Sequence, residues 1–167
     1  MFENFGKLLL AAVLLISCAG CADHFKQGVD AYKKADYSTA MKELRPLAEN
    51  GDASAQNYVG FMYDNGQGVP VDYKLAAEWY SKAAEQGNEV AQHNLGLLYG
   101  NGLGVQQDWV QALKWINLAV IISKSRHAQA VKDGNYAVTQ MTPEQIKEAE
   151  RLTDQWLANH RQILNNQ

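Results

Sequence analysis

The feature that most constrains this chain is a repeat of 36 residues in its middle part. Residues 48–83 align with residues 84–119 without a gap, and 15 of the 36 positions are identical. A partial third copy lies upstream, where residues 36–40 align with residues 72–76. In repeat proteins of this kind each unit is too small to bury its own apolar face, so neighbouring units stack and share a core. We therefore expect a stacked array.

Each central unit has the pattern of two helices joined by a turn. Asp52 and Asp72 precede apolar residues at helical spacing, and their side chains suit the N-cap position. Gly51 stands where the preceding helix ends, in the place of a left-handed residue. The sequence therefore predicts one helix before and one helix after the turn at residues 65–69.

Glycines recur at equivalent places in the two central units, and we expect them to be structural. They are Gly60, Gly66 and Gly68 in one unit and Gly96, Gly102 and Gly104 in the next. Gly60 and Gly96 lie within helices, where glycine costs about 1 kcal/mol relative to alanine. Close approach of a neighbouring helix is the simplest way to offset that cost. The other four belong to the turns.

The shared positions resemble Sel1-like repeats, which are relatives of the tetratricopeptide repeat. They are Ala55-Gln56, Gly60, Tyr63, Gly66-Gln67-Gly68-Val69, Asp72, Ala76, Trp79-Tyr80 and Ala83-Ala84-Glu85-Gln86-Gly87. The first unit, with Gly28, Ala31-Tyr32 and Asp36-Tyr37, is closer to the tetratricopeptide form. The resemblance covers residues 25–122 and implies an all-α fold, a short α/α solenoid with units at about 25–48, 52–84 and 88–122.

Residues 123–167 are expected to form a C-terminal helical cap. Residues 126–140 predict a helix with a weak point at Gly134. Thr142-Pro143-Glu144-Gln145 is a capping box with proline at the first helical position. The capping helix that follows should turn five residues inward and cover the last apolar face of the stack. These are Ile146, Ala149, Leu152, Trp156 and Leu157.

Residues 1–17 have the pattern of a signal peptide. The apolar run from Leu8 to Ile16 is shorter than the ~20 residues that span a bilayer, but it suits a secretory signal. Leu15-Ile16-Ser17-Cys18 resembles the bacterial lipobox, which implies lipid attachment at Cys18 and a linker at 18–24. Ala19 then favours an outer-membrane lipoprotein facing the periplasm. Cys21 is the second choice, and a secreted protein with a Cys18–Cys21 pair is the alternative.

The sequence carries no pattern of a catalytic, metal or nucleic-acid site. Its 15 Lys and Arg are outnumbered by 18 Asp and Glu, and no basic run suits a nucleic acid. Both cysteines precede residue 22, and the four histidines share no ligand spacing. The glycine turns lack the remaining residues of a phosphate-binding loop, and there is no nucleophile elbow. We expect no catalytic residue, no metal and no cofactor.

Recognition is the chemistry that remains. In related solenoids the first helices of successive units line a concave groove, and nine residues here fall at groove positions. They are Phe25, Val29, Tyr32, Asn57, Phe61, Asp64, Val90, His93 and Leu97. Five of them would form an aromatic-rich apolar stripe, which is typical of interface hot spots. The alternative is that Phe61 and Leu97 belong to the core between repeats.

These patterns predict a non-catalytic envelope lipoprotein that binds a protein or peptide, as a scaffold or regulator. One alternative is a periplasmic immunity protein that neutralises a secreted toxin, such as a phospholipase delivered by a type VI-type system. Another is an assembly subunit that associates with itself. A cell-wall-directed enzyme or sugar binder would need convergent carboxylates. Only Asp64 and Glu89 are acidic residues near the expected groove.

Overall fold

The computed structural model describes residues 22–123 and 128–162, and the regular structure in these ranges is helical. Residues 22–33 form the first described helix. The others are α2 (Tyr37–Glu49), α3 (Ala53–Asn65), α4 (Tyr73–Glu85), α5 (Glu89–Asn101), α6 (Trp109–Ile122), α7 (Ala128–Thr139) and α8 (Pro143–Asn159). The predicted all-α solenoid is confirmed. The expected signal peptide, Cys18 and Cys21 lie outside the described residues.

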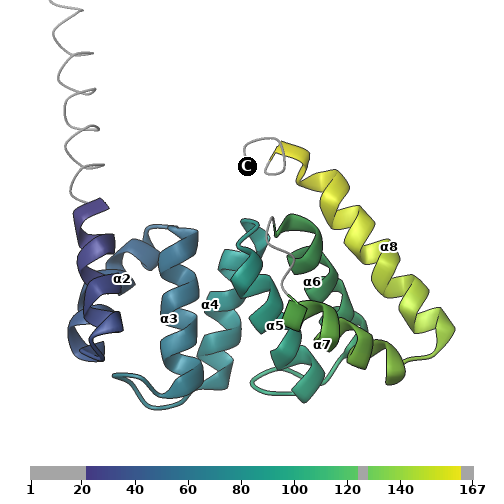
Figure 1. Cartoon of the computed structure of the whole chain (residues 1–167), viewed down its shortest axis with the longest axis horizontal. Coiled ribbons are helices and arrows are strands. Elements are labelled where there is room, and N and C mark those ends of the chain that lie inside the picture. Colours follow the sequence, from purple (N-terminus) through teal and green to yellow (C-terminus); the bar gives the residue numbers. More distant parts are fainter. Residues whose placement is uncertain (1–21, 124–127, 163–167) are drawn as a thin grey trace, which may run out of the picture.

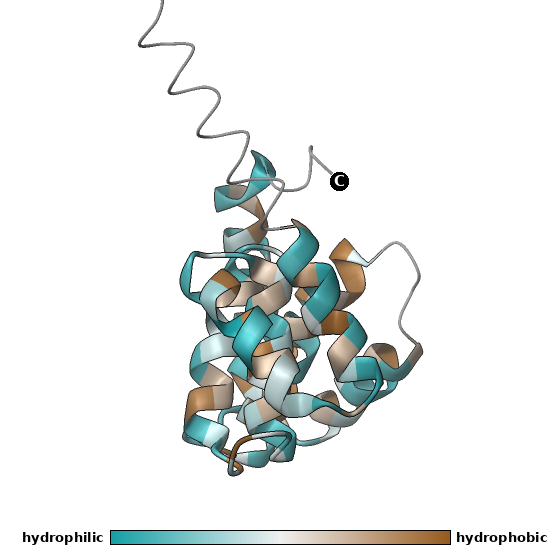
Figure 2. Ribbon diagram, turned by 90° about the vertical axis from the view of Figure 1, so that its left-hand side faces the viewer, coloured by the Kyte–Doolittle hydropathy of each residue, from teal (hydrophilic) through white to brown (hydrophobic). Residues whose placement is uncertain are grey.

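Successive helices pack against one another along the chain, from α2 to α6. In Figure 1, α3 to α6 stand next to one another in chain order, and α8 crosses the right-hand end. Every helix seen in Figure 2 carries both hydrophilic and hydrophobic residues, as expected when each helix buries only one face. The expected linker differs in one respect, because residues 22–24 already belong to the first helix. No helix in the described ranges is long and apolar enough to cross a bilayer.

Each helix from α2 to α6 begins at a side chain that accepts a hydrogen bond from its first turn. These N-caps are Asp36, Asp52, Asp72, Asn88 and Asp108. Both predicted caps are confirmed: the Ala55 amide donates to Asp52 Oδ1 at 2.7 Å, and the Leu75 amide donates to Asp72 Oδ1 at 2.9 Å. Each such bond satisfies an amide that the helix itself leaves unpaired.

The first helix of each unit crosses the second at a glycine. The pairs are Gly28 with Leu44, Gly60 with Tyr80, and Gly96 with Ile116. A Cβ on Gly60 would lie 2.8 Å from the Tyr80 ring, and one on Gly96 would lie 2.7 Å from Ile116 Cγ1. Close approach of a neighbouring helix, predicted for Gly60 and Gly96, is therefore confirmed, and Gly28 extends it to the first unit.

The turn inside each central unit packs on the preceding unit through its second glycine. Gly68 has φ +74°, and a Cβ there would lie 2.8–2.9 Å from the Cβ and main chain of Tyr37. Gly104 has φ +70°, and a Cβ there would overlap the main chain of Tyr73. Because Tyr37 and Tyr73 begin α2 and α4, each turn sits directly on the start of the previous unit's second helix.

A buried glutamine makes a second contact between units. Gln56 Nε2 donates to the Ala48 carbonyl at 3.0 Å, and Gln92 Nε2 donates to the Ala84 carbonyl at 3.1 Å. Both carbonyls lie in the last turn of a helix, beyond the reach of the regular helical bonds, and each also accepts a bond from the amide of the following glycine, Gly51 or Gly87. The repeated Ala-Gln pair therefore joins each first helix to the end of the helix before it.

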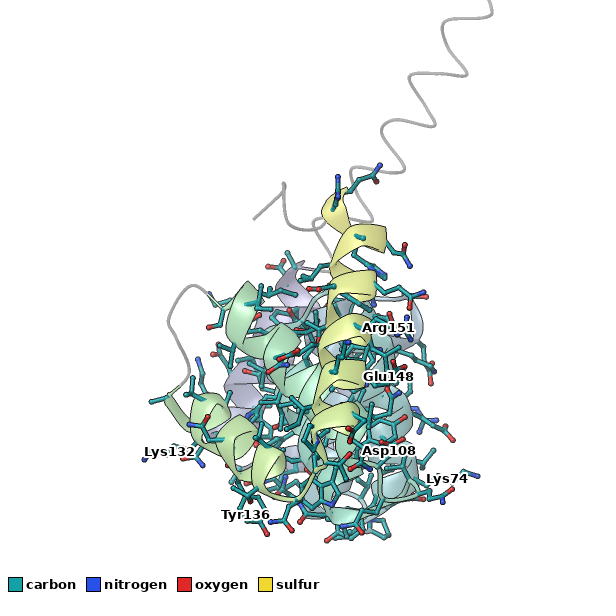
Figure 3. All side chains as sticks on the ribbon, turned by 90° about the vertical axis from the view of Figure 1, so that its right-hand side faces the viewer. Lys74, Asp108, Lys132, Tyr136, Glu148 and Arg151 are labelled. Atoms are coloured by element: carbon teal, nitrogen blue, oxygen red, sulfur yellow. The ribbon has the colours of Figure 1, made fainter. Side chains whose placement is uncertain are left out.

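The C-terminal helices close the stack in two different ways. α7 packs on α6 and contacts α5, whereas α8 packs on α6. The predicted capping box of α8 is confirmed, and Ala149 and Trp156 are buried. Trp156 Nε1 donates to Glu85 Oε2 at 2.7 Å, so α8 also reaches the end of α4. Figure 3 looks onto this end, with Glu148 and Arg151 on α8 and with Lys132 and Tyr136 on α7.

We predict that Gly104→Ala destabilises the fold more than Gly51→Ala. Both glycines have positive φ, which costs alanine roughly 1–2 kcal/mol. A Cβ on Gly51 meets nothing within 4 Å, whereas one on Gly104 overlaps Tyr73 and adds an overpacking penalty of about 1–3 kcal/mol. Urea unfolding should show the difference, and equal losses would mean that the turn does not depend on this contact.

Candidate functional site

A pocket of about 380 Å³ lies where the helix at 22–33, α3 and the start of α5 meet. It is lined by Phe25, Tyr32, Ser54, Asn57, Tyr58, Phe61, Asn88 and Val90. Five of these were predicted at groove positions, and the structure brings them together. Ser54, Tyr58 and Asn88 were not predicted. The pocket therefore lies on the face formed by the first helices of the three units.

Four aromatic rings form one side of the pocket. The Tyr58 ring stands edge-on to Tyr32, with centroids 5.3 Å apart, and to Phe25, at 6.1 Å. Tyr32 meets Phe61 in the same manner at 6.3 Å. Edge-to-face pairs are a favoured arrangement of aromatic rings. The cluster thus gives the pocket a preformed apolar wall.

Two side chains of α3, an amide and a carboxylate, carry oxygen atoms that no basic group in the described chain neutralises or pairs with. Asn57 Oδ1 is buried, and the described residues give it no hydrogen-bond partner. Asp64 is half-buried and accepts a hydrogen bond from the Tyr80 hydroxyl at 3.2 Å. Burial raises the pKa of the Asp64 carboxyl above its ordinary value, and the bond from Tyr80 opposes this only in part. Burial also raises the pKa of Tyr80.

The remaining predicted groove residues lie outside the pocket. Val29 packs against the core of the first unit. His93 Nε2 lies 2.8 Å from Asp133 Oδ2 on α7. Leu97 lines a cavity of about 50 Å³ between α5, α6 and α7. His93 and Leu97 therefore face α7, which shortens the open part of the groove.

The internal repeat separates residues that build the scaffold from residues that shape the pocket. The buried glutamine that contacts the preceding unit is identical in the two central units, as Gln56 and Gln92. Positions on the groove face of α3 differ from their counterparts in α5. The pairs are Asn57 and His93, Tyr58 and Asn94, Phe61 and Leu97, and Asp64 and Gly100. The pair of helices in each unit therefore forms with different residues at these positions.

Two further hollows lack a cluster of aromatic side chains. One of about 570 Å³ lies beside α4 and includes Tyr99, Gly104 and Val105, which are repeated scaffold residues. Another, of about 640 Å³, is lined mainly by polar residues of the 105–111 segment. Within residues 22–123 and 128–162, no three His, Cys, Asp or Glu side chains gather as they would around a metal ion. The aromatic pocket is the strongest candidate site.

The Sel1 repeat family model matches residues 53–88 and 90–120. The chain is a Sel1-like repeat protein. The two matched segments correspond to the two central units, from α3 to α4 and from α5 to α6. Sel1 repeat proteins are generally non-catalytic scaffolds for protein–protein interaction.

Two solved structures are similar to this Sel1-like repeat protein. One is a protective antigen present in uropathogenic Escherichia coli strains and displaying an SLR fold, with 29% identity, a TM-score of 0.79, and coverage of 87% of this chain and 32% of that chain. The other is a Sel1 repeat protein from Oxalobacter formigenes, with 33% identity, a TM-score of 0.61, and coverage of 77% and 54%. The chain thus spans about a third of the first and about half of the second. No curated protein matches the sequence.

We predict that Asp64→Asn makes the fold more stable at neutral pH. The folded-state pKa of Asp64 is raised, so its contribution favours folding below the unfolded-state pKa of about 3.9 and is lost as pH rises through the folded-state pKa. Asparagine removes the desolvated charge and keeps an acceptor for Tyr80. The free energy of unfolding of the variant, from urea titrations, should exceed that of the wild type at pH 7, and the gap should shrink towards pH 4. A gap that widens on acidification would contradict this.

Proposed function

We propose that this Sel1-like repeat protein is an envelope lipoprotein that binds a segment of a partner protein in its aromatic pocket, as a scaffold or regulator. One observation carries the proposal: four aromatic side chains gather around a hollow at positions where the repeats are free to differ. Interface hot spots are rich in such aromatic residues.

The size and surface of the pocket suit side chains of a peptide. A volume of about 380 Å³ falls in the range of small ligand sites, which run from roughly 300 to 1,000 Å³. Its lining combines aromatic carbon with amide and hydroxyl groups, and none of its residues is charged. Val90 leaves 41% of its surface exposed at one side of the pocket. An apolar side chain of a partner would cover this surface.

The sequence supports attachment to a membrane through Cys18. If Cys18 is lipidated, Phe25 follows the anchor by seven residues, which span at most about 25 Å. The pocket would then lie close to the bilayer surface, and its partner would be an envelope protein or one delivered into the periplasm. This proposal rests on the lipobox-like residues 15–18.

We predict that Val90→Asp abolishes partner binding and leaves the fold intact. Val90 is exposed and lies in the first turn of α5, where a carboxylate is favourable because of the helix dipole. Val131→Asp is the matched control, because Val131 is 42% exposed on α7 outside the pocket. The measurement is quantitative mass spectrometry of proteins crosslinked to the full-length chain in the native envelope.

The expected result is one protein that the wild type and Val131→Asp recover equally and that Val90→Asp recovers at least tenfold less. Recovery of a toxin encoded by a neighbouring gene would favour the immunity role, and recovery of a cell-wall or secretion component would favour the scaffold. Identical recovery by all three chains would refute binding in this pocket.

We predict that Cys18→Ser abolishes fatty-acid labelling and yields an unprocessed or soluble form. The sulfur atom of Cys18 would carry the lipid, and serine replaces this sulfur by oxygen with little change in size. Metabolic labelling with a fatty acid is the measurement, and Cys21→Ser is the control that should keep the label. The reverse pattern would move the anchor to Cys21, and labelling that survives both substitutions would exclude lipidation at these cysteines.

A further inference from the structure

The groove face of α3 carries a carboxylate that no basic side chain neutralises. In the described part of the chain, Asp64 has no ion-pair partner, and its hydrogen bond comes from the neutral Tyr80 hydroxyl. The carboxylate is half-buried, so it has lost part of its hydration. A partly desolvated charge without a counter-charge destabilises the fold.

The repeat itself does not require this carboxylate. The equivalent residue of the next unit is Gly100, which lies against the Trp109 ring, and that of the first unit is Tyr32. All three units form the same pair of helices although these three side chains differ. The charge of Asp64 is therefore best explained by something outside the described chain.

Asp64 lies on the same face of α3 as two pocket residues. Asn57, Phe61 and Asp64 follow one another at spacings of four and three residues, which brings side chains onto one side of a helix. At 1.5 Å per residue, the buried acceptor of Asn57 and the carboxylate are about 10 Å apart along the axis. Phe61 comes between them in the register of the helix. The half-buried carboxylate thus lies on the same helix face as an aromatic side chain of the pocket.

A partner segment with a basic side chain next to an apolar one would complement this arrangement of a carboxylate beside an aromatic side chain. Lysine and arginine lay their aliphatic stems on apolar surface and direct a charged, hydrogen-bond-donating end towards a carboxylate. Aromatic rings also attract such cations. The other acidic residue near the pocket is Glu89, between the lining residues Asn88 and Val90, and it too has no ion-pair partner among the described residues.

We propose that the partner segment places a lysine or arginine against Asp64 and an aromatic or large aliphatic side chain in the pocket. The inference rests on the proposed function, since it specifies what the same pocket recognises. The pairing offsets the cost of the Asp64 charge only when the partner is bound. Asp64 therefore sets specificity, and the aromatic wall supplies the apolar contact.

Selection from displayed random peptides on the full-length chain in detergent tests this directly. We expect the wild type to enrich peptides with Lys or Arg within four residues of an aromatic or large aliphatic residue. Asp64→Asn, which keeps an acceptor for Tyr80, should lower the enrichment of the basic residue at least tenfold and retain the apolar residue. Asp154→Asn is the control, because Asp154 is exposed on α8 and the charge change is the same.

The outcomes separate the two proposals. If the wild type enriches no peptide, binding of a segment in this pocket fails. If it enriches apolar peptides without a basic residue, or if Asp64→Asn leaves the basic preference intact, only the present inference fails. If Asp64→Asn does not fold, the wild type decides alone: replacing the basic residue of a selected peptide by glutamate must abolish its binding, and undiminished binding would overturn the inference.

Discussion

The stack depends on the second glycine of each inter-helix turn, because this residue sits directly on the main chain of the unit before it. Gly68 contacts the start of α2, and Gly104 contacts the start of α4. A side chain at either position would have to push the two units apart. Since Gln56 and Gln92 join the same pairs of units at the opposite end of the helices, each interface is fixed at two points. The spacing between units follows from these contacts.

The pocket is a consequence of that spacing. The two contact points of each interface set how closely the helix at 22–33 lies to α3. Aromatic rings from these two helices then meet in edge-to-face pairs. Tyr58 is central, because it meets both Phe25 and Tyr32. A charge such as that of Asp64 would be costly inside a core. It is tolerated on this face because the glycine and glutamine contacts between units do not involve Asp64. The four aromatic rings thus have two roles, because they pack on the cores of the units and also line the pocket.

Features that depend on neighbours in the sequence could be predicted. The caps Asp52 and Asp72, the capping box at Thr142 and the close approach at Gly60 and Gly96 all follow from local rules or from the repeat itself. Local rules apply because each feature involves residues within one turn or one unit.

Features that depend on the path of the C-terminal helices could not be predicted. α7 covers His93 and Leu97, and Trp156 reaches Glu85 on α4, because of packing between segments far apart in the chain. No periodicity encodes such contacts. Tyr58 was missed for a related reason. The register placed Asn57, Phe61 and Asp64 on the groove face, and Tyr58 joins the pocket through rings from another helix. The available signal was the comparison of the units: Tyr58 is aromatic, whereas the equivalent residue of the next unit is Asn94.

The two-point contacts also bear on how such a chain can change in length over evolution. Gly68 and Gln56 contact the unit before their own, and Gly104 and Gln92 make the equivalent contacts one unit further along. Duplication of one whole 36-residue unit before α5 would therefore recreate every existing interface and leave α7 and α8 on the last unit. A longer relative of this protein can thus differ by whole units, with a new set of groove residues in each.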